Sequence, residues 1–270
     1  MFPIGPPAVA VKSFALVIIP FCTHPHPSLS PSVVPKRSNT IRSHYPFPVQ
    51  PIAHIENCYA SKFGVPRQSG IVEVESRIVF EPEYRVAEAV RGLEEFDYVW
   101  LVWLFSEAQR EGWSPTVRPP RLGGNRRMGV FATRSPFRPN AIGLSSVRLV
   151  SVKVEPLLGP VLTVSGADLM DGTPLLDIKP YLPYTDSHPQ ARSGFAPEPA
   201  THLLEVHCEE ARLSLVEASQ RQALIEVLAH DPRPQYHHDP QRRYGMTFGS
   251  HEIHFVVDGD QLIVTAIDGV

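Results

Sequence analysis

The sequence predicts a mainly β protein with a β-barrel or sandwich-like body and a small α+β region after it. Short alternating or fully apolar runs, which are typical of strands, outnumber helical patterns from residue 49 to about residue 188. No strand-like run is followed by a GxGxxG turn, so a doubly wound nucleotide-binding sheet is not indicated. After residue 200, a helical pattern lies between strand-like runs, which indicates the second, α+β part.

Residues 1–48 do not share this pattern. They contain ten prolines, no Asp or Glu, and no sustained period. Their apolar piece, residues 14–22, is interrupted by Pro20 and is far too short to span a bilayer. Only Lys12 supplies a basic residue before it and no convincing cleavage site follows, which disfavours an export signal. We expect a disordered leader, or a start codon assigned too far upstream.

The first predicted strand covers residues 49–56, and a turn-rich polar segment at 62–70 leads into residues 71–75. Residues 83–95 carry apolar side chains at helical spacing and predict a helix. Residues 98–105 are apolar on both faces and rich in aromatic and β-branched side chains, so a buried central strand is expected. For the two tryptophans in that run, core packing is favoured over stacking on bases.

Two further strands are expected on either side of a stiff loop, at residues 128–132 and 142–154. Pro136 and Pro139 fix φ near −65° and favour extended geometry in the residues before them. Preorganised donors lose little entropy when a ligand binds, so such a loop suits a binding surface. The side chains that it would present are Arg134, Arg138 and Asn140.

The remaining elements follow a simple order. Residues 160–166 alternate as a strand, and an aspartate-rich stretch follows at 167–184. After a polar linker, strands are expected at 201–206, 250–257 and 261–267, with a helix at 213–229. Asp258-Gly259 is a hairpin-turn signal between the last two strands.

Positive charge is concentrated in the middle of the chain. The net charge is −3, yet no Asp or Glu occurs between Gly112 and Val154. A guanidinium pairs with phosphate or carboxylate through two hydrogen bonds, so the cluster favours an anionic ligand. On charge alone, a solvated basic face is an equal alternative. The arginines in this window are Arg118, Arg121, Arg126, Arg127, Arg134, Arg138 and Arg148.

Three cysteines lie far apart and form no CxxC pair, which disfavours a disulfide framework and fits a reducing cytoplasm. Asp168, Asp171 and Asp177 offer acceptors for amino or hydroxyl groups of a nucleoside-like ligand. They lack the DxDxDG spacing of a calcium loop, and no metal site is expected.

Residues 118–144 and 167–184 closely resemble the signature of the TrmO family, also called TsaA-like or YaeB-like. The resemblance implies a catalytic β-barrel domain at 49–188, a linker at 189–200 and a C-terminal α+β domain at 201–270. It also implies a homodimer that uses S-adenosylmethionine. The implied reaction is methylation of N6 of threonylcarbamoyladenosine at position 37 of threonine tRNA.

The implied reaction suggests catalytic residues by its chemistry, and the resemblance implies cofactor residues. Arg134 and Arg138 are candidates to hold the threonyl carboxylate and a phosphate or carbamoyl oxygen, because positive charge would stabilise a developing anion at N6. Asn140 is a candidate to orient the base, and Asp177 is a candidate proton acceptor. The implied cofactor residues are Arg67, Gln68, Ser69, Gly70, Phe105, Ser106, Arg134, Leu144, Asp171, Gly172, Thr173 and Pro174.

Phosphate contacts to tRNA are expected from the other arginines, Arg118, Arg121, Arg126 and Arg127, and from Arg233 in the C-terminal part. Two alternatives remain open at this point. One is a non-catalytic module that binds anticodon loops. The other is a methyltransferase of the same fold that acts on another acceptor.

Overall fold

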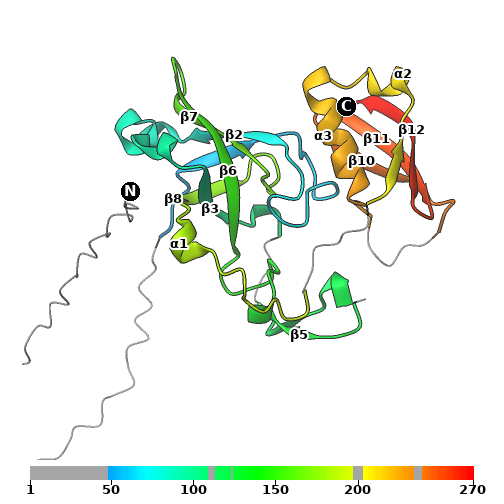
Figure 1. The fold of residues 1–270 in the computed structure, drawn as a ribbon, viewed down its shortest axis with the longest axis horizontal. Helices are drawn as coiled ribbons and strands as arrows, with labels where there is room; N and C mark the ends of the chain where they lie inside the picture. The colour runs from blue at the N-terminus through cyan, green and yellow to red at the C-terminus, as the bar shows by residue number, and fades with distance from the viewer. Residues whose placement is uncertain (1–47, 109–112, 123, 197–202, 234–238) are drawn as a thin grey trace, which may run out of the picture. The chain divides into compact units, whose positions relative to one another are not determined.

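The computed structural model describes residues 48–108, 113–122, 124–196, 203–233 and 239–270. The expectation of a leader at 1–48 therefore lies outside the described residues, residue 48 excepted. Six antiparallel strands close a barrel in the order β1-β2-β7-β6-β3-β8 (Figure 1). This confirms the predicted mainly β class. The strands are β1 Ala53–Glu56, β2 Glu75–Phe80, β3 Tyr98–Leu104, β6 Ile142–Glu155, β7 Gly159–Ser165 and β8 Pro174–Pro180.

Alternation along each strand supplies the barrel core, because successive side chains point to opposite faces. On β3, Val99, Leu101 and Trp103 are buried, whereas Trp100, Val102 and Leu104 on the other face are only half-buried. The expectation of burial on both faces of this strand is therefore only partly right. The fully enclosed side chains of the barrel include Ile55, Ile78, Leu101, Leu162 and Leu175.

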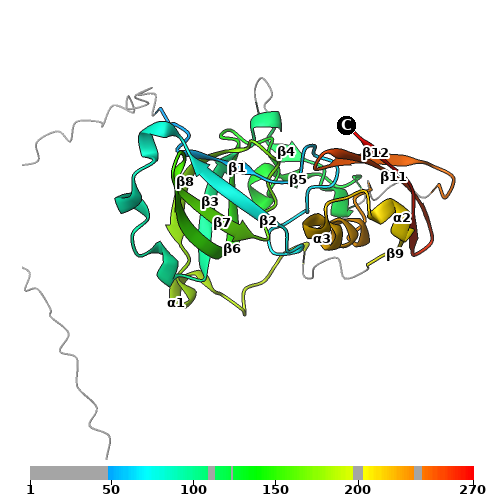
Figure 2. The same cartoon turned by 90° about the horizontal axis from the view of Figure 1, so that it is seen from above.

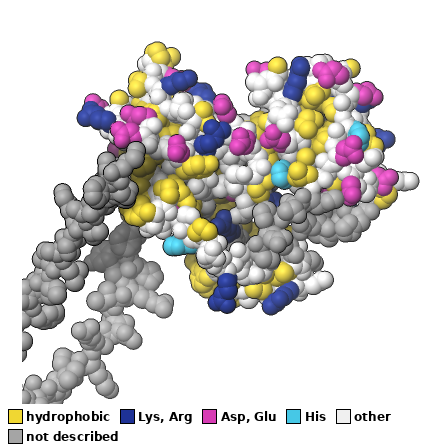
Figure 3. Space-filling view, viewed as in Figure 1, with side chains coloured by type: hydrophobic (Ala, Val, Ile, Leu, Met, Phe, Trp, Pro, Cys, Tyr) yellow, Lys and Arg dark blue, Asp and Glu magenta, His cyan; other side chains and the backbone are white. Residues whose placement is uncertain are grey.

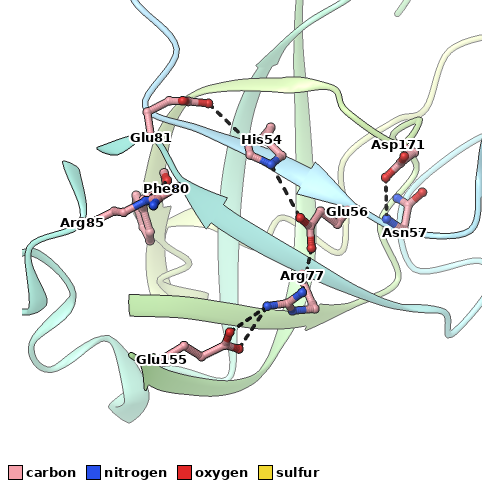
Figure 4. Close-up of polar contacts among 9 residues, drawn as sticks. All are labelled: His54, Glu56, Asn57, Arg77, Phe80, Glu81, Arg85, Glu155 and Asp171. Carbon is pink, nitrogen blue, oxygen red and sulfur yellow. Dashed lines mark hydrogen bonds and ion pairs between the residues drawn. The ribbon is translucent and has the colours of Figure 1, made fainter. Parts of the chain in front are cut away.

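The outer face of the barrel carries ion pairs that cross between strands (Figure 4). Arg77 on β2 contacts Glu56 on β1 at 2.8 Å and Glu155 on β6 at 3.0 Å. His54 lies 3.2 Å from Glu81. These groups are partly exposed, so each pair contributes no more than about 1 kcal/mol. The pair between Glu56 and Arg77 favours the observed β1–β2 register, in which these two residues lie opposite each other.

The helix predicted at residues 83–95 is wrong. Three separate 3-10 helices occupy this stretch: η1 Pro82–Tyr84, η2 Ala87–Val90 and η3 Leu93–Glu95. Val86 and Arg91 have extended backbone, and Gly92 has φ of 82°, which interrupts any helix. Of the apolar side chains at helical spacing, Val90 is the buried one.

Several strand boundaries also differ from the prediction. β1 begins at Ala53 rather than residue 49, since Pro51 has no N–H to donate to a neighbouring strand. Residues 128–132 form only a two-residue strand, β5 Met128–Gly129, followed by η6 Val130–Ala132. β5 pairs with β4, Thr116–Val117. β8 closes the barrel against β1 and β3 and was not predicted.

The C-terminal part is a four-stranded sheet in the order β10-β11-β12-β9, with α3 packed on one face (Figure 2). The expected helix begins at residue 218 rather than 213, and Tyr244–Phe248 is a strand that was not predicted. Gly259, with φ of 57°, turns the hairpin between β11 and β12. The elements are β9 Glu205–His207, α2 Glu210–Leu213, α3 Ala218–Ala229, β10 Tyr244–Phe248, β11 His251–Asp258 and β12 Gln261–Gly269.

The segment between β1 and β2 packs into the C-terminal core. Tyr59 and Val72 belong to the same buried cluster as Phe248 and Leu228. The N–H of Gly249 donates to the carbonyl of Cys58 at 2.8 Å. Residues 57–74 are thus fixed at both ends by barrel strands and along their length by the C-terminal sheet.

The short helices elsewhere are η4 Ser106–Ala108, η5 Pro120–Leu122 and α1 Pro183–Asp186. None of the helices within the described ranges has the length and apolar character needed to cross a membrane.

Candidate functional site

A cleft of about 620 Å³ opens where β3 ends and β6 begins. Its walls also include the segment between β1 and β2 and the proline-rich loop at 133–138. A cavity of this size suits a nucleoside-sized ligand. The lining residues that matter below are Lys62, Arg67, Gln68, Trp100, Trp103, Phe105, Ser106, Thr133, Arg134, Arg138, Gly143, Leu144, Asp168 and Thr173.

One wall of the cleft is aromatic and depends on a glycine. Trp103 on β3 lies opposite Gly143 on β6, and its ring crosses directly over that glycine. A Cβ at position 143 would lie 2.2 Å from the indole ring, so only glycine fits. Phe105 packs against Trp103 with ring centroids 4.2 Å apart.

A chain of polar groups runs from this wall to the carboxylate of Asp168. The indole N–H of Trp103 donates to Ser145 Oγ at 3.0 Å, and Ser145 Oγ–H donates to Asp168 Oδ1 at 2.5 Å. An indole N–H can only donate, so Ser145 accepts from Trp103 and directs its own proton to Asp168. The order of donors and acceptors in this chain is therefore fixed.

Burial raises the pKa of Asp168 above the ordinary aspartate value, since desolvation disfavours the charged form. The hydrogen bond from Ser145, the charge of Arg134 and the backbone N–H of Ser69 oppose that rise in the pKa. Asp168 is thus a carboxylate at the cleft wall with oriented donors on one side and a cation nearby.

The two loops of the cleft are joined by a side-chain hydrogen bond from Arg134 Nη1 to Gln68 Oε1. Behind Gln68, the guanidinium of Arg67 donates to the carbonyls of Asp231 and Arg233, each at 3.1 Å. The C-terminal part therefore supports the loop that carries four of the expected cofactor residues, Arg67, Gln68, Ser69 and Gly70.

The loop at 133–138 is also held by its own hydrogen bonds. Arg138 Nη1 donates to the carbonyl of Thr133 at 2.9 Å, and Ser135 N–H donates to Thr133 Oγ1 at 3.3 Å. Together with Pro136, these contacts fix the loop, while Arg138 remains on the cleft wall and Arg134 remains exposed.

The structure brings eight of the expected site residues together in the cleft. The rest of the cofactor set lies beside it and shapes it. Gly70 N–H donates to the carbonyl of Gly166 at 2.8 Å, next to Ser69. Pro174 begins β8. The eight in the cleft are Arg67, Gln68, Phe105, Ser106, Arg134, Arg138, Leu144 and Thr173.

Asp171 and Gly172 anchor a turn against β1. Asp171 Oδ1 accepts the N–H of Asn57 at 2.9 Å (Figure 4). Gly172, with φ of 72°, donates its N–H to the carbonyl of Ile55 at 2.8 Å. The turn places Thr173 at the cleft, whereas Asp171 and Gly172 themselves are exposed and do not line it.

Asp177 and Asn140 do not lie on the cleft wall. Asp177 faces Val102 across the β3–β8 pairing, and its carboxylate lies 2.7 Å from Lys179 Nζ. The same carboxylate accepts the N–H of Ile178. Asn140 is exposed at the end of the loop, and its carbonyl accepts the N–H of Ile142 at 2.8 Å.

The arginines expected to contact RNA separate into two groups. Arg118, Arg126 and Arg127 are exposed around the β4–β5 pair, and the side chain of Arg121 lies outside what the structure describes. Arg233 is different, because its side chain is only 12% exposed and pairs with Asp231 at 2.8 Å. That hydrogen bond raises the pKa of Arg233, which packs within the C-terminal part over the ring of Tyr244.

Sequence reasoning did not include Trp100 or Trp103 in the site, and it named Asp168 only as a possible acceptor for a nucleoside-like ligand. A usable signal existed for Trp103, since residues two apart on a strand share a face and Phe105 was already expected at the cofactor. The indole N–H of Trp100 donates to Asp186 Oδ2 at 2.8 Å. The pKa of Asp186 is lowered mainly by the hydrogen bond from the Leu182 N–H and, second, by this bond from Trp100.

No group of three or more His, Cys, Asp or Glu within the described ranges is arranged to hold a metal ion.

A closed barrel whose cleft has an aromatic wall, a partly buried carboxylate and nearby arginines defines a β-barrel protein with a cleft suited to a nucleoside-like ligand. The chain belongs to the tRNA-methyltransferase O family, TrmO. The N-terminal domain of that family matches residues 54–187, and its C-terminal domain matches residues 201–270. The resemblance found in the sequence is confirmed.

Similar proteins support this membership. The chain is 44% identical over 197 residues to the tRNA (adenine(37)-N6)-methyltransferase of Escherichia coli K12, covering 70% of this chain and 83% of that one. A putative S-adenosylmethionine-dependent methyltransferase of Pseudomonas aeruginosa PAO1, RcsF, is 43% identical over 216 residues, or 77% and 91% of the two chains. The expected cofactor is thereby confirmed for the family.

Solved structures agree in fold. A crystal structure of TrmO from Pseudomonas aeruginosa superimposes with a TM-score of 0.66 at 34% identity, over 82% of this chain and 98% of that one. Another TrmO crystal structure gives a TM-score of 0.66 at 36% identity, over 82% and 99%.

Proposed function

We propose that this chain is an S-adenosylmethionine-dependent tRNA methyltransferase. Its target is N6 of adenosine 37, in the form of threonylcarbamoyladenosine in threonine tRNA. The observation that carries this proposal is the cleft in which Asp168, Arg134 and Gln68 meet an aromatic wall. The 44% identity to the Escherichia coli tRNA (adenine(37)-N6)-methyltransferase supports it. We further propose that the protein acts in the cytoplasm as a homodimer, with barrel, linker and C-terminal domains at 49–188, 189–200 and 201–270.

The residues of the cleft fit S-adenosylmethionine. Phe105 and Leu144 offer apolar surface for the adenine ring, and Arg134 offers a cation for the carboxylate of the amino acid part. The side-chain carbonyl of Gln68 offers an acceptor for amino and hydroxyl groups. When bound, the cofactor would supply a methyl group on a sulfonium, whose leaving group is a neutral thioether, so the protein chiefly needs to align the reacting atoms.

The substrate nitrogen needs help from the protein, because its lone pair is delocalised into the adenine ring. A carbamoyl substituent makes this nitrogen less nucleophilic but its N–H more acidic. Positive charge next to the nitrogen therefore stabilises the developing anion. Arg138 and Arg134 provide that charge from a loop fixed by Pro136 and by internal hydrogen bonds, and one of them binds the threonyl carboxylate. Asn140 lies at the exposed end of the loop and off the cleft wall, so we assign it no contact with the target base.

We assign the proton from N6 to the carboxylate of Asp168 rather than to Asp177. Asp168 lines the cleft, and burial raises its pKa, which strengthens it as a base. Ser145 and the Ser69 N–H hold the carboxylate in place. Asp177 instead lies off the cleft wall and is paired with Lys179.

The test is methylation by the purified protein of threonine tRNA with and without the threonylcarbamoyl group. We expect methyl incorporation only into the modified tRNA. Equal incorporation into both would remove the carbamoyl group from the proposal and leave adenosine 37 as the target. Cofactor binding without incorporation into either tRNA would point to another acceptor. Binding of tRNA without cofactor binding would favour a non-catalytic module.

A further inference from the structure

Two large aromatic side chains lie in solvent beside the cleft. Trp113 is 51% exposed and Phe131 is 71% exposed, which is unusual for residues that bury so much apolar area when packed. Their rings lie roughly parallel, with an interplanar angle of 25° and centroids 6.1 Å apart. We call this pair the aromatic platform.

The fold holds the platform outward. The N–H of Val130 donates to the carbonyl of Pro115 at 3.0 Å, next to the pairing of Thr116 with Gly129. Val130 is buried, so the turn of η6 that starts there places Phe131 on the opposite, outer side. The exposure of Phe131 therefore follows from a fixed turn with a buried anchor, and Trp113 packs on the Phe131 ring.

Positive charge surrounds the platform. Arg118, Arg126 and Arg127 are exposed on the same short hairpin. No ion pair links any of the three to an acidic side chain among the described residues, and Arg127 contacts the hydroxyl of Thr116. Figure 3 shows dark-blue and yellow side chains side by side over the region where Figure 1 labels β5.

The platform is continuous with the cleft. Thr133 lies two residues after Phe131 and lines the cleft. Its N–H and its Oγ1–H both donate to the carbonyl of Val130, at 3.1 Å and 2.9 Å. One hydrogen-bonded turn therefore connects Phe131 to the cleft wall.

We propose that Trp113 and Phe131 stack on an unpaired base next to the target nucleotide, while the exposed arginines hold the flanking phosphates. Aromatic rings interleaved with cations are the recognition chemistry of single-stranded nucleic acid. This inference rests on the proposed RNA substrate. A second copy of the chain fits less well on this face, because a two-fold interface centred on the platform would bring both sets of these arginines together.

Trp113→Ala, Phe131→Ala and the double variant test the platform. Leu157→Ala, which truncates an exposed apolar side chain in the turn between β6 and β7, is the matched control. The affinity for a synthetic anticodon stem–loop of threonine tRNA is measured by fluorescence anisotropy without cofactor. We expect each platform variant to weaken binding on the order of tenfold, the control to bind normally, and Trp113→Phe to retain most affinity.

Stem–loops with an abasic site on either side of adenosine 37 identify the stacked base. One of them should bind the wild-type protein more weakly, while the double variant should not distinguish it from the intact loop. Cofactor affinity, measured by calorimetry, should be unchanged in every variant.

Three results would overturn the platform. If the wild-type protein binds the stem–loop and the variants bind it equally well, stacking is excluded while the proposed function stands. If the variants lose self-association in sedimentation and keep RNA affinity, the aromatic platform forms an interface with a second copy of the chain and does not bind RNA. If the wild-type protein binds no stem–loop, stacking next to adenosine 37 is excluded, and methylation of whole threonine tRNA decides the proposed function separately.

Discussion

The barrel and the segment at 113–140 are held together by different interactions. The barrel closes through six paired strands over side chains such as Ile78 and Leu101, which have no exposed surface. The segment has two short strands, 3-10 turns and prolines, and it is fixed by local hydrogen bonds. Stability therefore resides mainly in the barrel, and the binding groups reside on a loop that the barrel positions. Substitutions in the two regions should separate folding from activity.

The largest effect is expected from Leu101→Ala in the barrel core. Removing a fully buried leucine side chain costs about 2–5 kcal/mol of unfolding free energy, because it loses burial and leaves a cavity. Denaturant unfolding measures this cost. The matched substitution in the other region, Phe131→Ala, should change the unfolding free energy by less than about 0.5 kcal/mol. Equal losses in the two variants would contradict the division between the regions.

Gly143→Ala lies where the two regions meet, and its effect should be intermediate. The new methyl group would overlap the ring of Trp103, so the ring must move at a cost of about 1–3 kcal/mol. Because that ring forms a cleft wall, we expect cofactor affinity to fall at least about tenfold, equivalent to about 1.4 kcal/mol.

Gly129→Ala provides the control for Gly143→Ala, since a Cβ at position 129 meets nothing within 4 Å. Calorimetric titration with S-adenosylmethionine compares the two variants. Normal affinity in the Gly143 variant would show that Trp103 does not shape the cofactor site.

Arg134→Ala and Arg138→Ala should lower methylation at least about tenfold, with little change in unfolding free energy, because both side chains lie at the cleft and outside the barrel core. Arg138 also holds its own loop, so Arg138→Lys, which keeps the charge, tests whether positive charge alone restores activity. Single-turnover rates on modified tRNA provide the measurement. Rates within about threefold of wild type would remove these arginines from the mechanism.

The smallest effect on stability is expected from Asp168→Asn. The pKa of Asp168 is raised in the folded protein, so its ionised form is disfavoured there and reduces stability above that folded pKa. The asparagine variant should therefore melt slightly higher than wild type at neutral pH. The difference should disappear as the pH falls below the unfolded aspartate value, about 3.9. Melting temperatures across this range measure it.

Asp177→Asn serves as the comparison in the same series, because Asp177 lies off the cleft wall. Asp168→Asn should abolish most methylation, whereas Asp177→Asn should leave it nearly intact. The opposite ranking of the two variants would return the proton acceptor to Asp177.

The sequence predicted those parts of the fold whose signal is local. The strands at β3, β6 and β7 were expected because their alternation is long and uninterrupted. The helix at 83–95 was wrong because the backbone is extended at Val86 and Arg91 and left-handed at Gly92, which the apolar spacing alone does not reveal. β8 was not predicted, because prolines stand at both ends of the strand and mask its pattern. Its pairing with β1 and β3 depends on closure of the barrel, which the local sequence does not show.

The site divides in the same way. Arg134 and Gln68 were expected from the family motif, and the structure joins them. The Trp103–Ser145–Asp168 chain spans three distant parts of the sequence, so only strand register brings it together. Arg233 was expected to contact RNA because of its charge. The structure instead pairs its largely buried side chain with Asp231, which the sequence analysis did not predict.

The most direct measurement is mass spectrometry of nucleosides from threonine tRNA in cells that lack this gene. We expect the methylated form of threonylcarbamoyladenosine to be lost in these cells. It should return with the wild-type gene and not with the Arg134→Ala variant. An unchanged profile in the deleted strain, with purified protein that still binds S-adenosylmethionine, would contradict adenosine 37 as the acceptor.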